Sequence, residues 1–261
     1  MTEWNAGDYY ERSALQKWLA DRSLSGLGLN GDERVLDVGC GDGKITAEIA
    51  GRVPRGSVVG IDPSTHMIDF ARGHFAANQP NLSFAVGDAT RLEFHGAFDL
   101  IVSFNALHWV ADQAAALRGM REALAARGRA LLQFVSRGER KPLEDVIEET
   151  SHAARWSRYF ADHRPPYLHL PPEPYRRLAE DCGLRVDRVD TALEAWDFGT
   201  REAFAAFAHA TFVEWTKLVP AGEHDGFIAD VLDRYRQLSD GSAADAAVFH
   251  FYQSRFALRR G

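Results

Sequence analysis

The sequence predicts an α/β fold built on a doubly wound, mostly parallel sheet. Short apolar runs typical of buried parallel strands alternate with amphipathic segments typical of helices. The first run, at 35–38, is followed by three glycines at alternate positions, which allow a sharp turn as a helix begins. The next run, at 57–62, ends in a carboxylate about twenty residues beyond those glycines.

The glycines and this carboxylate together predict a site for a nucleoside-bearing cofactor. Gly39, Gly41 and Gly43 let the backbone approach a ligand closely, and Asp62 has the spacing of an acid that binds ribose hydroxyls. Asp62 can also be a simple helix cap before Pro63. A dinucleotide fingerprint requires a glycine where Lys44 stands, so a nicotinamide cofactor is disfavoured.

The remaining elements follow in order along the chain. Helical faces come after the first two strands, at Ile45, Ile49 and Ala50 and at Met67, Phe70 and Ala71. The first half then continues with strands at 82–86 and 98–104, a helix at 113–126 and a strand at 130–135. The second half is predicted to contain a helix at 143–159, a proline-rich turn region, a helix at 175–181, and strands at 185–198 and 248–258.

The last two strands are predicted to pair in antiparallel fashion. About forty-five residues separate them, which is too many for a hairpin loop. We therefore expect a helical insertion at 200–240, which is the candidate substrate cap. The chain then divides into a helical lid at 1–30, a cofactor domain at 31–199, the cap at 200–240, and a final strand within 241–261.

Composition favours a soluble enzyme that acts on a small molecule. The chain has 261 residues, of which 46% are hydrophobic, and its net charge of −7 with no basic cluster argues against nucleic-acid binding. Cys40 and Cys182 lack metal-ligand spacing, so no metal and a reducing compartment are expected. Neither a secretion signal nor a membrane span is evident, and a cytoplasmic location without membrane association is expected.

Four segments resemble the motifs of the class I S-adenosylmethionine-dependent methyltransferases. The pattern Asp37-x-Gly39-x-Gly41-x-Gly43 resembles their motif I, and 60–64, 86–89 and 98–105 resemble their ribose-binding, adenine-contacting and fourth-strand segments. The resemblance covers roughly 30–137 and implies S-adenosylmethionine as cofactor and a seven-stranded sheet. It assigns the cofactor site to Asp37, Gly39, Cys40, Gly41, Gly43, Asp62, Pro63, Met67, Asp88, Ala89, Phe104 and Asn105. Asp88 and Asn105 can equally close turns, and Cys40 can be a packing residue.

The segment 105–110 carries the prediction about the methyl acceptor. In the family it faces the transferred methyl group, and Leu-His-Trp-Val resembles the trans-aconitate and juvenile hormone acid carboxyl methyltransferase group. The Trp109 indole N–H can only donate, which suits a carboxylate oxygen, and His108 can donate as well. A carboxylate is already ionised at neutral pH, so a carboxyl O-methyltransferase needs no base. The alternatives are packing roles for both rings, an O-, N- or C-methyltransferase with His108 as general base, and a catalytically inactive cofactor-binding module.

The N-terminus and the cap supply further candidates. Trp4, Asn5 and Tyr9 resemble the opening of the trans-aconitate-type enzymes, which makes Tyr9 a third candidate catalytic residue. The cap region has an aromatic set that can be ordinary packing or can line a pocket for an acid with apolar bulk: Trp196, Phe204, Phe207, His209, Phe212 and Trp215. The expected partner is a small-molecule acid, and the oligomeric state is left open.

Overall fold

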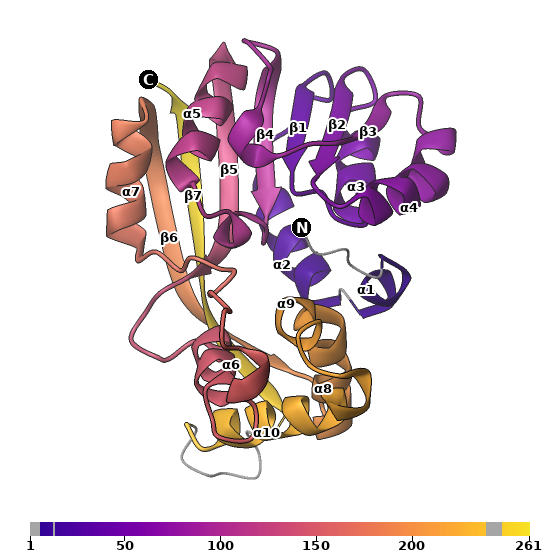
Figure 1. Ribbon diagram of the computed structural model, residues 1–261. Coiled ribbons are helices and arrows are strands. Elements are labelled where there is room, and N and C mark those ends of the chain that lie inside the picture. The colour runs from indigo at the N-terminus through magenta and orange to yellow at the C-terminus, as the bar shows by residue number, and fades with distance from the viewer. Residues whose placement is uncertain (1–5, 13, 239–246) are drawn as a thin grey trace.

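The computed structural model describes residues 6–12, 14–238 and 247–261, and Trp4 and Asn5 lie outside these ranges. Its centre is one seven-stranded sheet with the order β3-β2-β1-β4-β5-β7-β6 (Figure 1). Neighbouring strands from β3 to β5 run parallel, whereas β7 is antiparallel to both β5 and β6. This order confirms the predicted doubly wound sheet and its antiparallel C-terminal pair.

The strands lie close to their predicted positions. Their bounds are β1 Arg34–Val38, β2 Ser57–Asp62, β3 Leu82–Val86, β4 Phe98–Phe104, β5 Leu124–Ser136, β6 Leu184–Asp197 and β7 Val248–Arg260. Successive residues of a strand point to opposite faces, and both faces of the central strands are buried. Val35 thus packs in the cluster on one face of the sheet and Leu36 in the cluster on the other.

Helices cover both faces of the sheet. α2 (Ala14–Leu24), α3 (Lys44–Arg52) and α4 (Thr65–Phe75) pack on one face, and α5 (Gln113–Ala123) and α7 (Pro172–Asp181) pack on the other. The short α1 (Ala6–Arg12) precedes α2. Single 3₁₀ turns occur at Ala76–Asn78, Ala89–Arg91, Leu107–Trp109, Ser157–Tyr159 and Ala221–Glu223. In the described parts of the chain, no helix has the length and apolar character needed to cross a bilayer.

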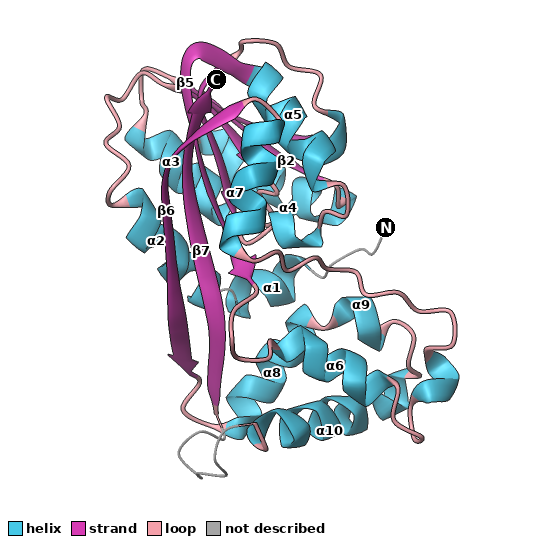
Figure 2. Ribbon diagram, turned by 90° about the vertical axis from the view of Figure 1, so that its left-hand side faces the viewer, coloured by secondary structure: helices cyan, strands magenta, loops and turns pink. Residues whose placement is uncertain are grey.

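A separate helical cap lies at the end of the sheet where β6 and β7 extend furthest (Figure 2). It contains α6 (Leu143–Ser151), α8 (Arg201–Thr211), α9 (Val213–Thr216) and α10 (His224–Arg236). Their apolar side chains share one core with Phe249 and Phe251 of β7 and with Leu15 and Leu19 of α2. The cap therefore draws α6 from within the predicted cofactor domain as well as the helices of the predicted insertion. The boundaries 31–199 and 200–240 themselves stay a prediction.

The predicted helix at 113–126 is too long. α5 ends at Ala123 because the N–H groups of Gly96 and Ala97 donate to the carbonyls of Glu122 and Ala123, at 2.8 and 2.9 Å, and take up the acceptors of the last turn. Leu124 is fully buried and pairs with Phe98, so β5 starts six residues earlier than the predicted strand at 130.

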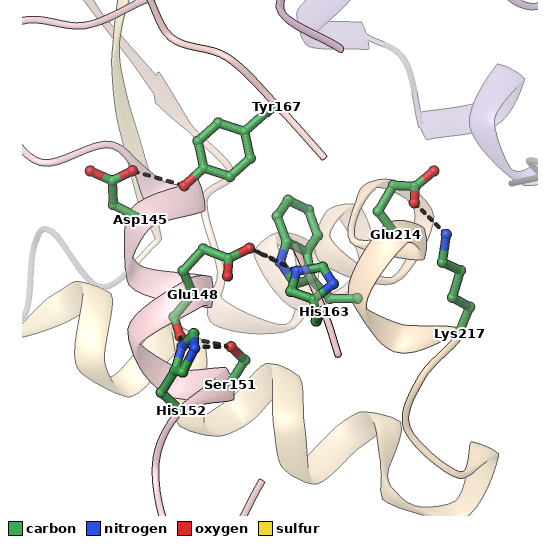
Figure 3. Close-up of polar contacts among 9 residues, drawn as sticks. Asp145, Glu148, Ser151, His152, His163, Tyr167, Glu214 and Lys217 are labelled. Carbon is green, nitrogen blue, oxygen red and sulfur yellow. Dashed lines mark hydrogen bonds and ion pairs between the residues drawn. The ribbon is translucent and has the colours of Figure 1, made fainter. Parts of the chain in front are cut away.

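The predicted helix at 143–159 is also too long, since α6 ends at Ser151. The Ser151 hydroxyl donates to the Glu148 carbonyl at 2.7 Å, and the His152 ring lies 2.7 Å from the same oxygen. Figure 3 shows Ser151 and His152 side by side at this end of the helix. Such side-chain bonds to the backbone compete with the next helical turn, and only the short turn Ser157–Tyr159 follows.

Candidate functional site

The glycine loop connects β1 to α3 in a backbone conformation that favours glycine. Gly39, Gly41 and Gly43 have φ angles of +79°, +52° and +82°. A Cβ atom on Gly39 would lie 2.2 Å from the Cβ of Ala106, so the loop approaches the end of β4 closely. The Gly39 N–H also donates to the Ile61 carbonyl at 2.8 Å, which ties the loop to β2.

Asp62 joins this loop to the start of the next helix. Its two carboxylate oxygens accept the N–H of Gly41 at 3.0 Å and the N–H of Ser64 at 2.9 Å. Both bonds fix the carboxylate at the carboxyl end of β2, where ligands bind in open parallel sheets.

A cavity of about 500 Å³ opens at these strand ends. Nine of the twelve predicted cofactor residues line it: Gly39, Gly41, Asp62, Pro63, Met67, Asp88, Ala89, Phe104 and Asn105. Tyr9 and Trp109, two of the predicted catalytic residues, line it as well. Successive strand ends therefore bring together most of the predicted site.

Three predicted cofactor residues lie beneath the cavity surface instead of lining it. Asp37 is buried and accepts the Thr46 hydroxyl at 2.7 Å. Cys40 is also buried, as expected for packing, and a Cβ on Gly43 would lie 2.7 Å from the Cβ of Ala71. Their roles in cofactor binding stay predictions, and any such role would be indirect, through the shape that they give the loop.

Burial raises the pKa of Asp37 to about 7. The Thr46 hydrogen bond lowers this pKa, while the charges of Asp62 and Asp42 raise it further. Three carboxyl groups around one loop thus differ in environment, and only Asp62 lines the cavity.

A second, smaller cavity of about 90 Å³ lies between the sheet and the cap. Tyr9, Asn105 and Trp109 line both cavities and mark where they meet. Most of its remaining wall is apolar and comes from the cap and β7, including Ile147, Phe207, Phe212, Trp215, Phe249 and Phe251. Its polar lining residues are Gln16, His108, Glu144, Thr211 and Gln253. The arrangement suits a small acceptor held next to a cofactor.

Asn105 lies at this junction in a conformation unusual for a residue other than glycine, with φ +55°. Its N–H donates to the Gln133 carbonyl at 2.7 Å, and its side-chain oxygen accepts from Gln253 at 2.9 Å. These bonds to β5 and β7 hold the backbone turned where β4 ends, which aims the following segment into the smaller cavity.

His108 is buried beside the smaller cavity. Burial lowers the pKa of its imidazole well below the usual value, and the nearby His169 lowers this pKa further. Among the described residues, none makes a hydrogen bond with its Nδ1 atom. His108 is therefore neutral at physiological pH and poorly suited to hold an abstracted proton.

Tyr9 keeps its hydroxyl proton. Burial raises the pKa of Tyr9, and the charges of Asp42 and Asp62 raise it further. The protonated hydroxyl can donate to an anionic group in either cavity.

Trp109 is oriented partly by the cap. Its ring meets that of Trp215 edge-on, with centroids 6.0 Å apart. Trp215 in turn donates its indole N–H to Glu148 at 2.7 Å, and His163 lies 3.0 Å from the same carboxylate oxygen. Figure 3 shows Glu148 and His163 facing one another across the cap.

Sequence reasoning missed Gln16 and Glu144 in the lining of the smaller cavity. Gln16 has no clear sequence signal, because it lies in α2 whereas Tyr9 lies in the separate helix α1. Glu144 has no clear signal either, because an acidic residue in the first turn of a helix is ordinary. Three arginines in the same half of the chain, Arg155, Arg158 and Arg164, line neither cavity, and Arg155 pairs with Asp230 at 3.0 Å.

Comparison with known proteins finds similarity to methyltransferases. A family model described as a methyltransferase domain matches residues 35–128, which contain the glycine loop, Asp62 and Trp109. Juvenile hormone acid O-methyltransferase of Bombyx mori is 34% identical over 164 residues, covering 58% of this chain and 56% of that protein. Trans-aconitate 2-methyltransferase of Methylobacterium radiotolerans is 30% identical over 162 residues, covering 62% and 60%. The chain thus matches less than two thirds of the length of either enzyme.

A solved structure extends the likeness of fold over nearly the whole chain. It is phosphoethanolamine N-methyltransferase 2 of Haemonchus contortus in complex with S-adenosyl-L-methionine. The TM-score is 0.63 at 17% identity, covering 98% of this chain and 56% of the other.

Proposed function

We propose that this chain, which a methyltransferase-domain model matches over residues 35–128, uses S-adenosylmethionine to methylate the carboxylate of a small organic acid and gives a methyl ester. The cofactor supplies an electrophilic methyl group. The protein then has to bind the acid, orient one carboxylate oxygen toward that methyl group, and exclude water.

The larger cavity fits the cofactor. Its wall combines a carboxylate that can accept ribose hydroxyls, Asp62, with the close-approach backbone of Gly39 and Gly41. Apolar side chains such as Met67 and Phe104 provide surfaces for the remainder of the nucleoside. Trp109 and Tyr9 would lie between the bound cofactor and the acceptor.

The observation that carries the proposal is the chemistry of the smaller cavity where it meets the larger one. Trp109 can donate an indole N–H, Tyr9 a hydroxyl and Gln16 an amide N–H, and all three are neutral donors. Donors of this kind bind a carboxylate and leave one of its oxygens free to react. No proton has to be removed, because a carboxylate is ionised at neutral pH.

The state of His108 disfavours the alternative of an O-, N- or C-methyltransferase that uses this residue as base. A general base works best when its pKa lies near the operating pH. Burial lowers the pKa of His108 far below that range. The names of the relatives, juvenile hormone acid O-methyltransferase and trans-aconitate 2-methyltransferase, also favour an acid acceptor.

A screen with methyl-labelled S-adenosylmethionine tests the proposal. Each carboxylic acid of the set is assayed beside its primary carboxamide and its alcohol, which have similar shapes and no carboxylate. We expect labelled product from at least one acid and none from its two analogues. Label on alcohols or amines, with none on any acid, would favour the His108-base alternative.

A further inference from the structure

We propose that Glu144 forms a second recognition point in the smaller cavity, and that the acceptor is a short acid with a hydrogen-bond donor, a hydroxyl or ammonium group, at the end remote from the reacting carboxylate. This inference rests on the proposed function. The proposed function concerns the reacting carboxylate, and the recognition point concerns the other polar group of the acceptor.

Glu144 stands in the first turn of α6 and lines only the smaller cavity. Its side chain is 13% exposed. Its Oε2 atom is buried and has no hydrogen-bond partner among the described residues. The neighbouring side chains in the same wall, Leu143 and Ile147, are apolar.

The wall of the cavity supplies no cation for this carboxylate among the residues that the structure describes. Neither lysine nor arginine occurs among the described residues that line the cavity. Behind it, His169 has a fully buried side chain whose Nε2 atom lies 3.9 Å from Glu144 Oε1, too far for a hydrogen bond. Neither nitrogen of the His169 ring finds a partner in the parts of the chain that the structure describes.

Glu144 lines the smaller cavity but not the larger one, which is proposed to hold the cofactor. The two cavities meet at Tyr9, Asn105 and Trp109. From Trp109 the rings of His108 and His169 follow in succession, with centroid separations of 5.1 and 5.6 Å, and Glu144 comes after His169. Trp109 and Glu144 line the same small cavity, so an acid bound at Trp109 can place its other end against Glu144.

The chemistry of Glu144 determines which groups can occupy that end. A carboxylate accepts hydrogen bonds and cannot donate them, and a buried carboxylate without a partner is unfavourable. A hydroxyl or ammonium group of the acceptor would supply the missing donor. A second carboxylate would instead meet a like charge, so dicarboxylic acids are disfavoured. The cavity of about 90 Å³ limits the acceptor to a short chain.

Four acids of equal length test the inference, with a methyl, a hydroxyl, an ammonium or a carboxylate group at the far end. For the unaltered protein we expect kcat/KM for the hydroxyl and ammonium acids to exceed that for the methyl acid about tenfold or more. Glu144→Leu should abolish or reverse this preference. Glu144→Gln keeps an acceptor oxygen but loses the negative charge. Its kcat/KM should therefore still favour the hydroxyl acid over the methyl acid, but it should no longer favour the ammonium acid.

The matched control is Glu149→Gln, the same change on the same helix at a position that lines neither cavity. It should leave all four kcat/KM values unchanged. Equal values for the methyl, hydroxyl and ammonium acids in the unaltered protein, or an unchanged pattern in Glu144→Leu, would overturn the inference. Circular dichroism of each variant confirms that it is folded.

Calorimetric binding of the four acids to protein loaded with S-adenosylhomocysteine separates the two proposals. Binding that prefers donors and depends on Glu144, without methylation, supports this recognition point and contradicts the proposed reaction. Methylation without donor preference contradicts the recognition point alone. If none of the four acids binds while the wider screen yields a methylated acid, the recognition point is wrong and the proposed reaction stands.

Discussion

Two aspartates at successive strand ends behave differently because their surroundings differ. Asp62 lines the larger cavity and accepts two backbone N–H groups, whereas Asp37 is buried beneath the glycine loop against Thr46. The sequence predicted both as cofactor residues. Which of the two aspartates lines the cavity depends on the side of the glycine loop that faces solvent. The spacing of the strands along the sequence does not show which side this is.

The raised pKa of Asp37 predicts a specific pH dependence of stability. The pKa is about 7 in the folded protein against a reference of 3.8, so the folded state binds this proton more tightly. Its contribution to stability is complete below the reference pKa and is lost as pH rises through about 7. Asp37→Asn keeps an acceptor for Thr46 and removes the titration. The unfolding free energy of the unaltered protein minus that of Asp37→Asn should fall by roughly 2–3 kcal/mol between pH 5 and pH 8.

Urea denaturation of both proteins at the two pH values measures this difference. A constant difference would mean that Asp37 does not titrate in this window.

Replacement of His108 separates a positioning role from a catalytic base. Because the acceptor carboxylate needs no deprotonation, His108→Gln should keep kcat within about tenfold of the unaltered protein, whereas loss of a general base costs about 10²–10⁴-fold. Steady-state assays over pH 6–8, with calorimetric confirmation of cofactor binding, give the answer. A loss near 10³-fold with intact cofactor binding would restore the base mechanism.

At the scale of single elements, strands were predicted better than helices. The strands at 57–62, 82–86 and 98–104 have the predicted bounds, because each is a short run with several buried apolar residues and turn-forming residues close to its ends. The two helices that were predicted too long both end through tertiary or side-chain bonds. For α5 these come from Gly96 and Ala97, which are distant in sequence, and composition carries no sign of them.

We expect a single added methyl group in the glycine loop to reduce both stability and cofactor binding. Gly39→Ala places a Cβ 2.2 Å from the Cβ of Ala106 at a φ of +79°, so the loop must move away from β4. We expect loss of more than about 1 kcal/mol of stability and loss of measurable cofactor binding.

Gly51→Ala is the matched control, since nothing lies within 4 Å of the new Cβ and α3 continues around it. It should bind the cofactor normally and be as stable as the unaltered protein or more so. Thermal unfolding and calorimetric titration with S-adenosylmethionine measure both effects. Normal cofactor binding by Gly39→Ala would contradict the close-approach role of this loop.

At the scale of the whole molecule, the sequence singled out many of the residues that line the larger cavity and fewer of those that line the smaller one. The resemblance to S-adenosylmethionine-dependent methyltransferases is confirmed, and its motifs lie at consecutive strand ends of one sheet. The smaller cavity instead combines residues of α2, α6, α8, α9 and β7. Contacts among such distant segments follow from packing of the cap, which is why Glu144 could not be identified before the fold was known.

The cap aromatics illustrate the same limit. The sequence left open whether they pack or line a pocket, and the structure divides them. Phe207, Phe212 and Trp215 line the smaller cavity, whereas Phe204 is buried in the core of the cap. Trp196 packs against Trp18, with ring centroids 5.6 Å apart. The expected cytoplasmic location and absence of nucleic-acid binding stay predictions.

The central claim, that an acid carboxylate receives the methyl group, is tested most directly by the chemistry of the product. The protein is incubated with methyl-labelled S-adenosylmethionine and an acid that the screen finds active, and the isolated product is treated with mild alkali. A methyl ester hydrolyses, so the account predicts that the label is released as volatile methanol and the unlabelled acid is recovered. Label that stays attached to the product through this treatment would place the methyl group on nitrogen, carbon or an ether oxygen and would contradict the account.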